Sequence, residues 1–175
     1  MRITAITDIV VPISSAIRNA YIDFSQMTAS VVAIHTDVQR DGRPVVGFGF
    51  NSNGRYAPQG LLRERFIPRL KAAKPEEIID ARGLIDPAKC WDAMMKNEKP
   101  GGHGERSVAV GVLDMALWDA VSKAEGVPLW RLLADRYNNG NADKTAWVYA
   151  AGGYYYPEKD IEGLQDEMKY YLDLG

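Results

Sequence analysis

The sequence contains a single cysteine, Cys90, among its 175 residues. One cysteine cannot form an internal disulfide, and it gives no cysteine-based metal cluster. An excess of positive charge is also missing, since 21 lysines and arginines face 23 acidic residues for a formal net charge of −2. The chain therefore lacks the basic patch through which proteins bind nucleic acid.

Long apolar runs are absent as well. No stretch approaches the roughly 20 apolar residues that a membrane-spanning helix requires. The first residues do not combine an apolar segment with a small-residue cleavage site, as a secretion signal would. We therefore expect a cytoplasmic protein with no membrane partner. Hydrophobic residues make up 46% and charged residues 25%, which is the balance of a globular domain, and the length predicts one domain or slightly more.

The first third of the chain favours an antiparallel sheet. Residues 3–13, 28–36 and 44–50 are rich in β-branched and apolar side chains and predict three strands. A turn at residues 40–43 would join the last two strands. The stretch at residues 14–30 has no clean period, and a loop of that length in a compact domain usually serves as a lid or binding loop.

Helical spacing of apolar residues follows, beginning with Leu61 and Leu62. Asp86 followed by Pro87 predicts the start of a second helix, with Trp91, Met94 and Met95 on its apolar face. A helix over residues 105–125 presents mostly small side chains on one side, which predicts a neighbour that packs closely. A short helix is expected at residues 129–137.

A glycine-rich stretch, Asn97 to Ser107, precedes the long helix and has three glycines within four residues. Unpaired N–H groups at a helix N-terminus attract anions, and Lys99 and Arg106 add positive charge. The stretch suggests a small anionic ligand near residues 99–106. The alternative is a plain flexible connection, because glycine-rich loops are common. A nucleotide loop is disfavoured, since the Gly-Lys-Ser/Thr ending is missing and Ser107 replaces the third glycine of the dinucleotide fingerprint.

Two acids, Asp114 and Asp119, lie inside the long helix. They are either catalytic carboxylates or structural ones, placed on the polar side of the helix or capping a neighbouring segment. His103 is a weak candidate for a catalytic acid, and a solvated loop histidine is the alternative.

The most linker-like stretch is residues 138–141, Asn-Asn-Gly-Asn, and we place a domain boundary there, with domains at 1–142 and 143–175. Thr145 to Ala150 predicts a strand that is apolar on both faces, and a helix with Ile161, Leu164 and Met168 on one face follows. This order is typical of the first unit of a parallel β/α array. One such unit cannot bury both faces of its strand, so we expect the front part of something longer or a piece that needs a partner.

These residues carry a family resemblance. Ser107 to Ala120, followed by Lys123, Gly126 and Pro128-Leu129, resembles the N-terminal signature of the mandelate racemase-like branch of the enolase superfamily. Residues 17–24, 49–56, 97–110 and 148–157 resemble the D-tartrate dehydratases of this branch, and the likeness covers essentially the whole chain. The departures from the signature affect packing positions: Val112, Ser122 and Ala134.

The resemblance implies an α+β fold, an enolase-type N-terminal capping domain of a three-stranded antiparallel sheet plus helices, followed by the first β/α unit of a truncated TIM barrel. It also implies a dehydratase in which Mg²⁺ on three barrel carboxylates stabilises an enediolate. A lysine removes the proton, a histidine helps hydroxide leave, and oxaloacetate forms. In the family, those residues lie beyond the position of Gly175. We therefore expect no catalytic residue and no metal ligand in this chain, and no dehydration by the chain alone.

The resemblance implies substrate-contact residues at Asn19, Asn53, Lys99 and Tyr154, for a tartrate-like dicarboxylic hydroxy acid. Each has a structural alternative: turn residues for the two asparagines, a solvated charge for the lysine and a packing ring for the tyrosine. Full-length relatives are expected to be homo-oligomers. Two other functions stay open: a non-catalytic capping module that docks on a separately encoded barrel, and a dehydratase for another sugar acid.

Overall fold

The computed structural model describes residues 1–52 and 54–175, and groups them into two units. The first unit comprises Met1–Val11 and Thr28–Ala142, and the second comprises Pro12–Met27 and Asp143–Gly175. The elements in chain order are β1 (Ile3–Pro12), the 3₁₀ turn η1 (Phe24–Gln26), β2 (Thr28–Arg40), β3 (Arg43–Asn51), α1 (Ala57–Leu61), the π-helical turn η2 (Leu62–Phe66), α2 (Ile67–Ala72), α3 (Pro75–Ile78), α4 (Pro87–Met95), α5 (Arg106–Glu125), α6 (Leu129–Tyr137) and α7 (Ile161–Asp173).

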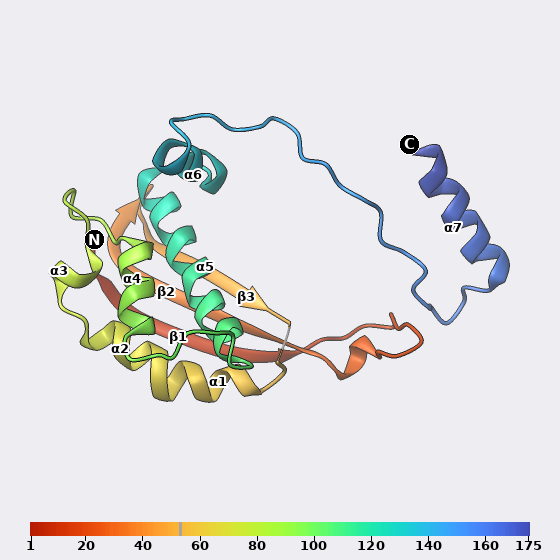
Figure 1. The fold of residues 1–175 in the computed structure, drawn as a ribbon, viewed down its shortest axis with the longest axis horizontal. Coiled ribbons are helices and arrows are strands. Elements are labelled where there is room, and N and C mark those ends of the chain that lie inside the picture. Colours follow the sequence, from red (N-terminus) through yellow and green to blue (C-terminus); the bar gives the residue numbers. More distant parts are fainter. Residues whose placement is uncertain (53) are drawn as a thin grey trace. The chain divides into compact units, whose positions relative to one another are not determined.

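The first unit is built on a three-stranded sheet with the order β1-β2-β3 (Figure 1). Strands β2 and β3 pair antiparallel, with Val32 opposite Gly49 and Ile34 opposite Gly47. Asp41 and Gly42 join them, both with positive φ (50° and 72°), which is the backbone that a tight hairpin requires. The predicted three-stranded antiparallel sheet with helices is confirmed.

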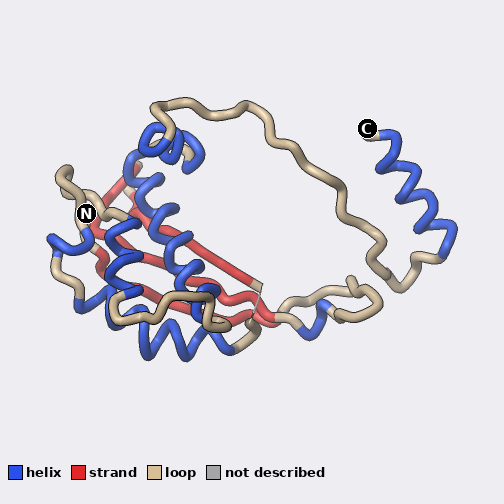
Figure 2. The backbone as a smooth tube through the Cα atoms, viewed as in Figure 1, coloured by secondary structure: helices blue, strands red, loops and turns tan. Residues whose placement is uncertain are grey.

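Helix α5 lies along one face of this sheet (Figure 2), and glycines in β3 permit its close approach. A Cβ atom added to Gly47 would lie 2.1 Å from the Ala116 carbonyl oxygen, and one added to Gly49 would lie 2.2 Å from the Val112 carbonyl oxygen. No side chain fits in that space. The small residues on this side of α5 therefore meet a close neighbour, as the sequence predicts.

The core forms between the sheet, α5 and the shorter helices. Asp86 caps α4 by accepting hydrogen bonds from the Ala88 and Lys89 N–H groups, as predicted. Met94 is fully buried, whereas Trp91 is 39% exposed, so only part of the predicted apolar face of α4 is core. The side chains buried most completely include Val32, Ile34, Leu62, Phe66, Ile85, Leu113 and Leu117. Burial raises the pKa of the Cys90 thiol to about 12, so this group stays protonated at neutral pH.

In the second unit, the predicted strand at residues 145–150 is wrong. The structure has no strand there, and Trp147, Val148 and Tyr149 are each more than three-quarters exposed. The predicted helix is present as α7, capped by Asp160, which accepts from the Gly163 N–H. A helix satisfies its own backbone, whereas a strand needs a neighbour to take its hydrogen bonds, and no described strand pairs with this segment.

No helix in the described part of the chain has both the length and the apolar character to span a membrane.

Candidate functional site

The glycine-rich loop at residues 97–105 owes its path to left-handed backbone positions. Asn97, Gly101, His103 and Gly104 all have positive φ, and the value of 107° at Gly101 is one that glycine tolerates best. The ring Nε2–H of His103 donates to the Pro100 carbonyl at 2.7 Å. The His103 ring therefore helps to close the loop, which supports the structural alternative for this residue.

The side chain of Glu98, at the start of the loop, is the centre of an arginine cluster. Its carboxylate is 2% exposed and pairs with Arg65 and Arg69 at 2.8 Å and with Arg106 at 3.1 Å. Two of these arginines come from one helical segment, at positions four residues apart, and the third begins α5. We call these four residues the Glu98 cluster. The cluster was not predicted from the sequence, although Arg65 and Arg69 are four residues apart and therefore share one face of a helix.

Arg106 also holds the backbone of the loop. Arg106 is only 5% exposed. Its guanidinium donates to the carbonyl of Lys99, at 2.7 Å, and to the carbonyl of Gly101. Arginine suits this role because its fixed fork of donors reaches several acceptors at once. The predicted positive charge at residue 106 is therefore present, but it points into the loop and its guanidinium is engaged there.

The charges around this loop favour an anion. Burial alone would raise the pKa of Glu98, but hydrogen bonds from Arg69 and Arg106 and the charge of Arg65 hold that pKa below its usual range. The carboxylate is thus ionised at neutral pH, and it balances one of three arginines. A pocket beside the loop is lined by Arg65, Lys99 and Arg106 among others, so it carries a net positive charge.

Lys99 is exposed within this loop, and its side chain lines the same pocket. Asn53, the second predicted contact, lies outside the described residues. The next residue, Gly54, packs closely on Glu105, because a Cβ atom at Gly54 would lie 2.3 Å from the Glu105 carboxylate. The residue that follows Asn53 therefore lies beside the end of the glycine-rich loop.

The start of β2 and the end of β3 contain buried polar groups without hydrogen-bond partners among the described residues. The hydroxyls of Thr28 and Ser30 and the carboxamide of Asn51 are buried and make no hydrogen bond there. Ser30 and Asn51 face each other across β2 and β3. Buried polar groups are nearly always satisfied, so these three side chains are suited to an ordered water.

Asn19 and Tyr154, the other predicted contacts, belong to the second unit. Arg18 and Tyr155 exchange two backbone hydrogen bonds, so the structure brings the neighbours of Asn19 and Tyr154 together. The Asn19 Oδ1 accepts from the N–H groups of Tyr21 and Ile22 at 2.9 and 2.7 Å, as a turn residue does.

The Tyr154 ring is half-buried and packs edge-on against Phe24, with centroids 5.8 Å apart. The Tyr154 ring thus has a packing role, and Asn19 has a turn role. Both contacts match the structural alternatives for these two residues.

The two acids of α5 differ in role. Asp119 accepts from the backbone N–H of Phe48 at 2.7 Å and pairs with Lys123, whose Nζ donates to the Val46 carbonyl at 3.0 Å. Asp119 is thus a capping partner for the edge of β3. Asp114 is half-buried, and this burial raises its pKa.

Among the described residues, no three His, Cys, Asp or Glu side chains lie close enough together to hold a metal ion. The described side chains therefore do not fit the Mg²⁺ site that the resemblance implies, and no step through the metal is assigned to them.

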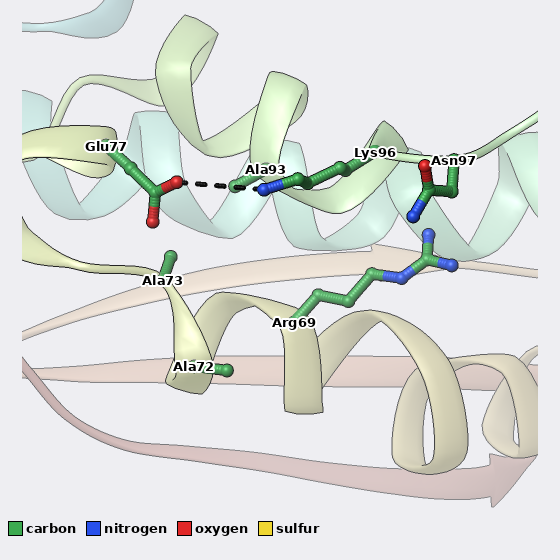
Figure 3. Close-up of a pocket in the computed structure, with 7 residues that line it drawn as sticks. All are labelled: Arg69, Ala72, Ala73, Glu77, Ala93, Lys96 and Asn97. Carbon is green, nitrogen blue, oxygen red and sulfur yellow. Dashed lines mark ion pairs between the residues drawn. The ribbon is translucent and has the colours of Figure 1, made fainter.

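A second pocket lies between α2, α3 and α4 (Figure 3). Its rim carries the ion pair of Glu77 and Lys96, at 3.9 Å. Arg69 points toward Asn97 in this view, but its guanidinium is already engaged by the Met94 carbonyl and Glu98. The cationic groups of this pocket are thus paired, and Lys99 does not line it.

Three characterised relatives resemble this sequence. It is 31% identical over 113 residues to an arabinonate dehydratase of Saccharolobus solfataricus, which covers 64% of this chain and 26% of the relative. It is 32% identical over 129 residues to the D-galactonate dehydratase family member RspA of Halomonas elongata, with coverages of 70% and 26%. A D-mannonate dehydratase of Rhizorhabdus wittichii is 38% identical over 68 residues, with coverages of 38% and 14%.

The chain thus spans about a quarter of the length of the first two relatives. No family model matches it. One solved structure, a mandelate racemase/muconate lactonizing enzyme-like protein from Rubrobacter xylanophilus, aligns with a TM-score of 0.46 and 18% identity, over 74% of this chain and 32% of that one.

Proposed function

We propose that the chain is the capping part of an acid-sugar dehydratase. The chain is similar to part of several such dehydratases, which agrees with the enolase-superfamily resemblance of its sequence. The observation that carries this proposal is the similarity to dehydratases of three different sugar acids. In this role the chain holds the hydroxy acid, and residues outside the chain remove the proton next to the carboxylate and release water. The proposed domains are 1–142 for the cap and 143–175 for the first barrel unit.

The proposed substrate is a dicarboxylic hydroxy acid, with D-tartrate as the first choice and oxaloacetate as its product. A diacid has a second carboxylate that needs a cationic partner away from the reacting carbon. The positive pocket beside the glycine-rich loop supports this choice, because Lys99 and Arg65 both line it. The names of the relatives refer to monocarboxylic sugar acids, so the charged pocket is where a difference in substrate would arise.

The proposed contacts are Lys99 for the second carboxylate and Asn53, Asn19 and Tyr154 for hydroxyl or carboxylate oxygens. Lys99 has the strongest support, since it is exposed and lines the positive pocket. The side-chain oxygen of Asn19 and the ring of Tyr154 already have structural roles. Their remaining polar groups are the ones assigned to the substrate.

The test joins this chain in frame to the part of arabinonate dehydratase that follows its matching segment. The fusion and the unfused chain are incubated with Mg²⁺ and D-tartrate, D-arabinonate, D-galactonate or D-mannonate, and 2-oxo acid formation is followed with semicarbazide. We expect product from the fusion with at least one acid and none from the unfused chain. A folded fusion that converts none of the four acids would contradict the proposal.

A further inference from the structure

The Glu98 cluster has a geometry that goes beyond simple charge pairing. Arg106 joins three separate points of the loop, because it contacts the Glu98 carboxylate and the carbonyls of Lys99 and Gly101. Glu98 in turn joins the loop to Arg65 and Arg69 on the helical segment at residues 57–72. The backbone on both sides of Lys99 is therefore fixed to two helical segments through the nearly buried side chains of Glu98 and Arg106.

A loop with this many left-handed positions would not hold one path by itself. Glycine has the largest conformational freedom of any residue, and Gly101, Gly102 and Gly104 all follow Lys99 within five positions. The energetic cost of ordering such a loop must be met by contacts. In the described part of the chain, the hydrogen bonds of Arg106 and the internal bond from His103 to Pro100 supply them.

We propose that Arg106 and Glu98 are positioning residues, which hold the glycine-rich loop so that the Lys99 ammonium meets the carboxylate of the bound acid. This inference rests on the proposed function. We assign Arg106 no contact with the acid, because its side chain is nearly buried and makes three hydrogen bonds to Glu98 and to the carbonyls of Lys99 and Gly101. Its contribution is preorganisation, in which the loop is ordered before the acid arrives and binding therefore costs less.

The test measures two properties of the 175-residue chain: the affinity for D-tartrate by titration calorimetry and the hydrogen exchange of peptides covering residues 97–105 and 108–121. Arg106→Lys keeps the charge but cannot reach all three acceptors. We expect faster exchange at residues 97–105, unchanged exchange at 108–121, and roughly tenfold weaker binding of D-tartrate.

Three further variants separate the roles. Lys99→Met should weaken binding without changing exchange of the loop, as expected of a direct contact. Arg82→Lys is the matched control, because Arg82 pairs with Asp80 and Glu125 at the opposite end of α5, and it should change neither property. Should Arg106→Lys fail to fold, Glu98→Gln tests the same anchor, and loop exchange should again rise while residues 108–121 stay protected.

The outcomes distinguish the two proposals. If the unmodified chain binds D-tartrate and Arg106→Lys or Glu98→Gln binds it equally well with unchanged loop exchange, the positioning role is wrong and the proposed function stands. If the unmodified chain binds no D-tartrate, D-tartrate as the ligand of this cap is wrong and the positioning role toward it is overturned, whereas the dehydratase role is decided by the fusion assay with the four acids.

Discussion

The two units of the chain contain similar kinds of residues but bury them to different extents. Leu117 on α5, in the first unit, is fully buried, whereas Leu172 on α7, in the second, is 80% exposed. Every fully buried side chain among the described residues belongs to the first unit. Both leucines sit on helices, so helix formation alone does not bury an apolar face. Burial requires a partner surface, which the first unit supplies from its own sheet.

This difference also divides the candidate site. The loop that carries Lys99 is fixed by charges at the edge of a complete core. Asn19 and Tyr154 belong to a unit without one, held by the backbone hydrogen bonds of Arg18 with Tyr155 and by the packing of Tyr154 on Phe24. We therefore infer that the Lys99 loop is preorganised by this chain.

The largest loss of stability is expected when a buried side chain in the core of the first unit is truncated. Leu117→Ala should lower the free energy of unfolding by about 2–5 kcal/mol, because it removes buried apolar volume. The matched change Leu172→Ala, on the exposed face of α7, should change it by less than about 0.5 kcal/mol. Urea unfolding followed by circular dichroism measures both. Equal losses for the two variants would remove the contrast between the units.

The next largest change in stability is expected where α5 contacts the sheet. Gly47→Ala should destabilise the first unit by about 3 kcal/mol, because the new methyl group overlaps the Ala116 carbonyl. Gly111→Ala is the control, since nothing lies within 4 Å of a Cβ atom there. It should be neutral or stabilising by up to about 1 kcal/mol, because alanine favours helix. An unchanged free energy of unfolding for Gly47→Ala, measured with urea, would contradict the close approach of α5 to β3.

Acid should loosen the loop before it unfolds the core. The pKa of Glu98 is lowered in the folded chain, so its stabilisation is complete above the ordinary value of about 4.3. It is lost as the pH falls through the folded pKa. The stability difference between the unmodified chain and Glu98→Gln should therefore stay constant at neutral pH and shrink as the pH falls below about 4.3. Urea unfolding at several pH values measures it, and a pH-independent difference would argue against an ionised Glu98 in the folded state.

The smallest change in stability is expected at the edge of β3. Lys123→Met removes the hydrogen bond to the Val46 carbonyl. It should lower the free energy of unfolding by at most about 1 kcal/mol, because Lys123 is partly exposed. An uncovered strand edge promotes association, so self-association should rise with concentration in light scattering. Arg131→Met is the control, because it breaks the i,i+4 ion pair with Asp135 on α6. It should lower the free energy of unfolding equally little and leave the chain monodisperse. Association of both variants, or of neither, would contradict the edge role.

The sequence predicts the first unit well because its signals are local and consistent. Alternating apolar residues, the turn at Asp41 and Gly42 and the cap at Asp86 all favour the elements that form. The strand predicted at residues 145–150 does not form, because its apolar, β-branched composition is a local signal, whereas a strand also needs a paired neighbour and none of the described strands pairs with this segment. The Glu98 cluster was missed for another reason: its four charges come from two separate parts of the chain and meet only after folding.

The most direct test of the acid-holding cap is a saturation-transfer NMR experiment on the purified chain with D-tartrate and Mg²⁺. One time course reports both the bound acid and any product. We predict transfer of saturation to D-tartrate that falls in Lys99→Met, with no oxaloacetate signal. Oxaloacetate accumulating at an enzyme-like rate, or the absence of any transfer to D-tartrate, would contradict the account.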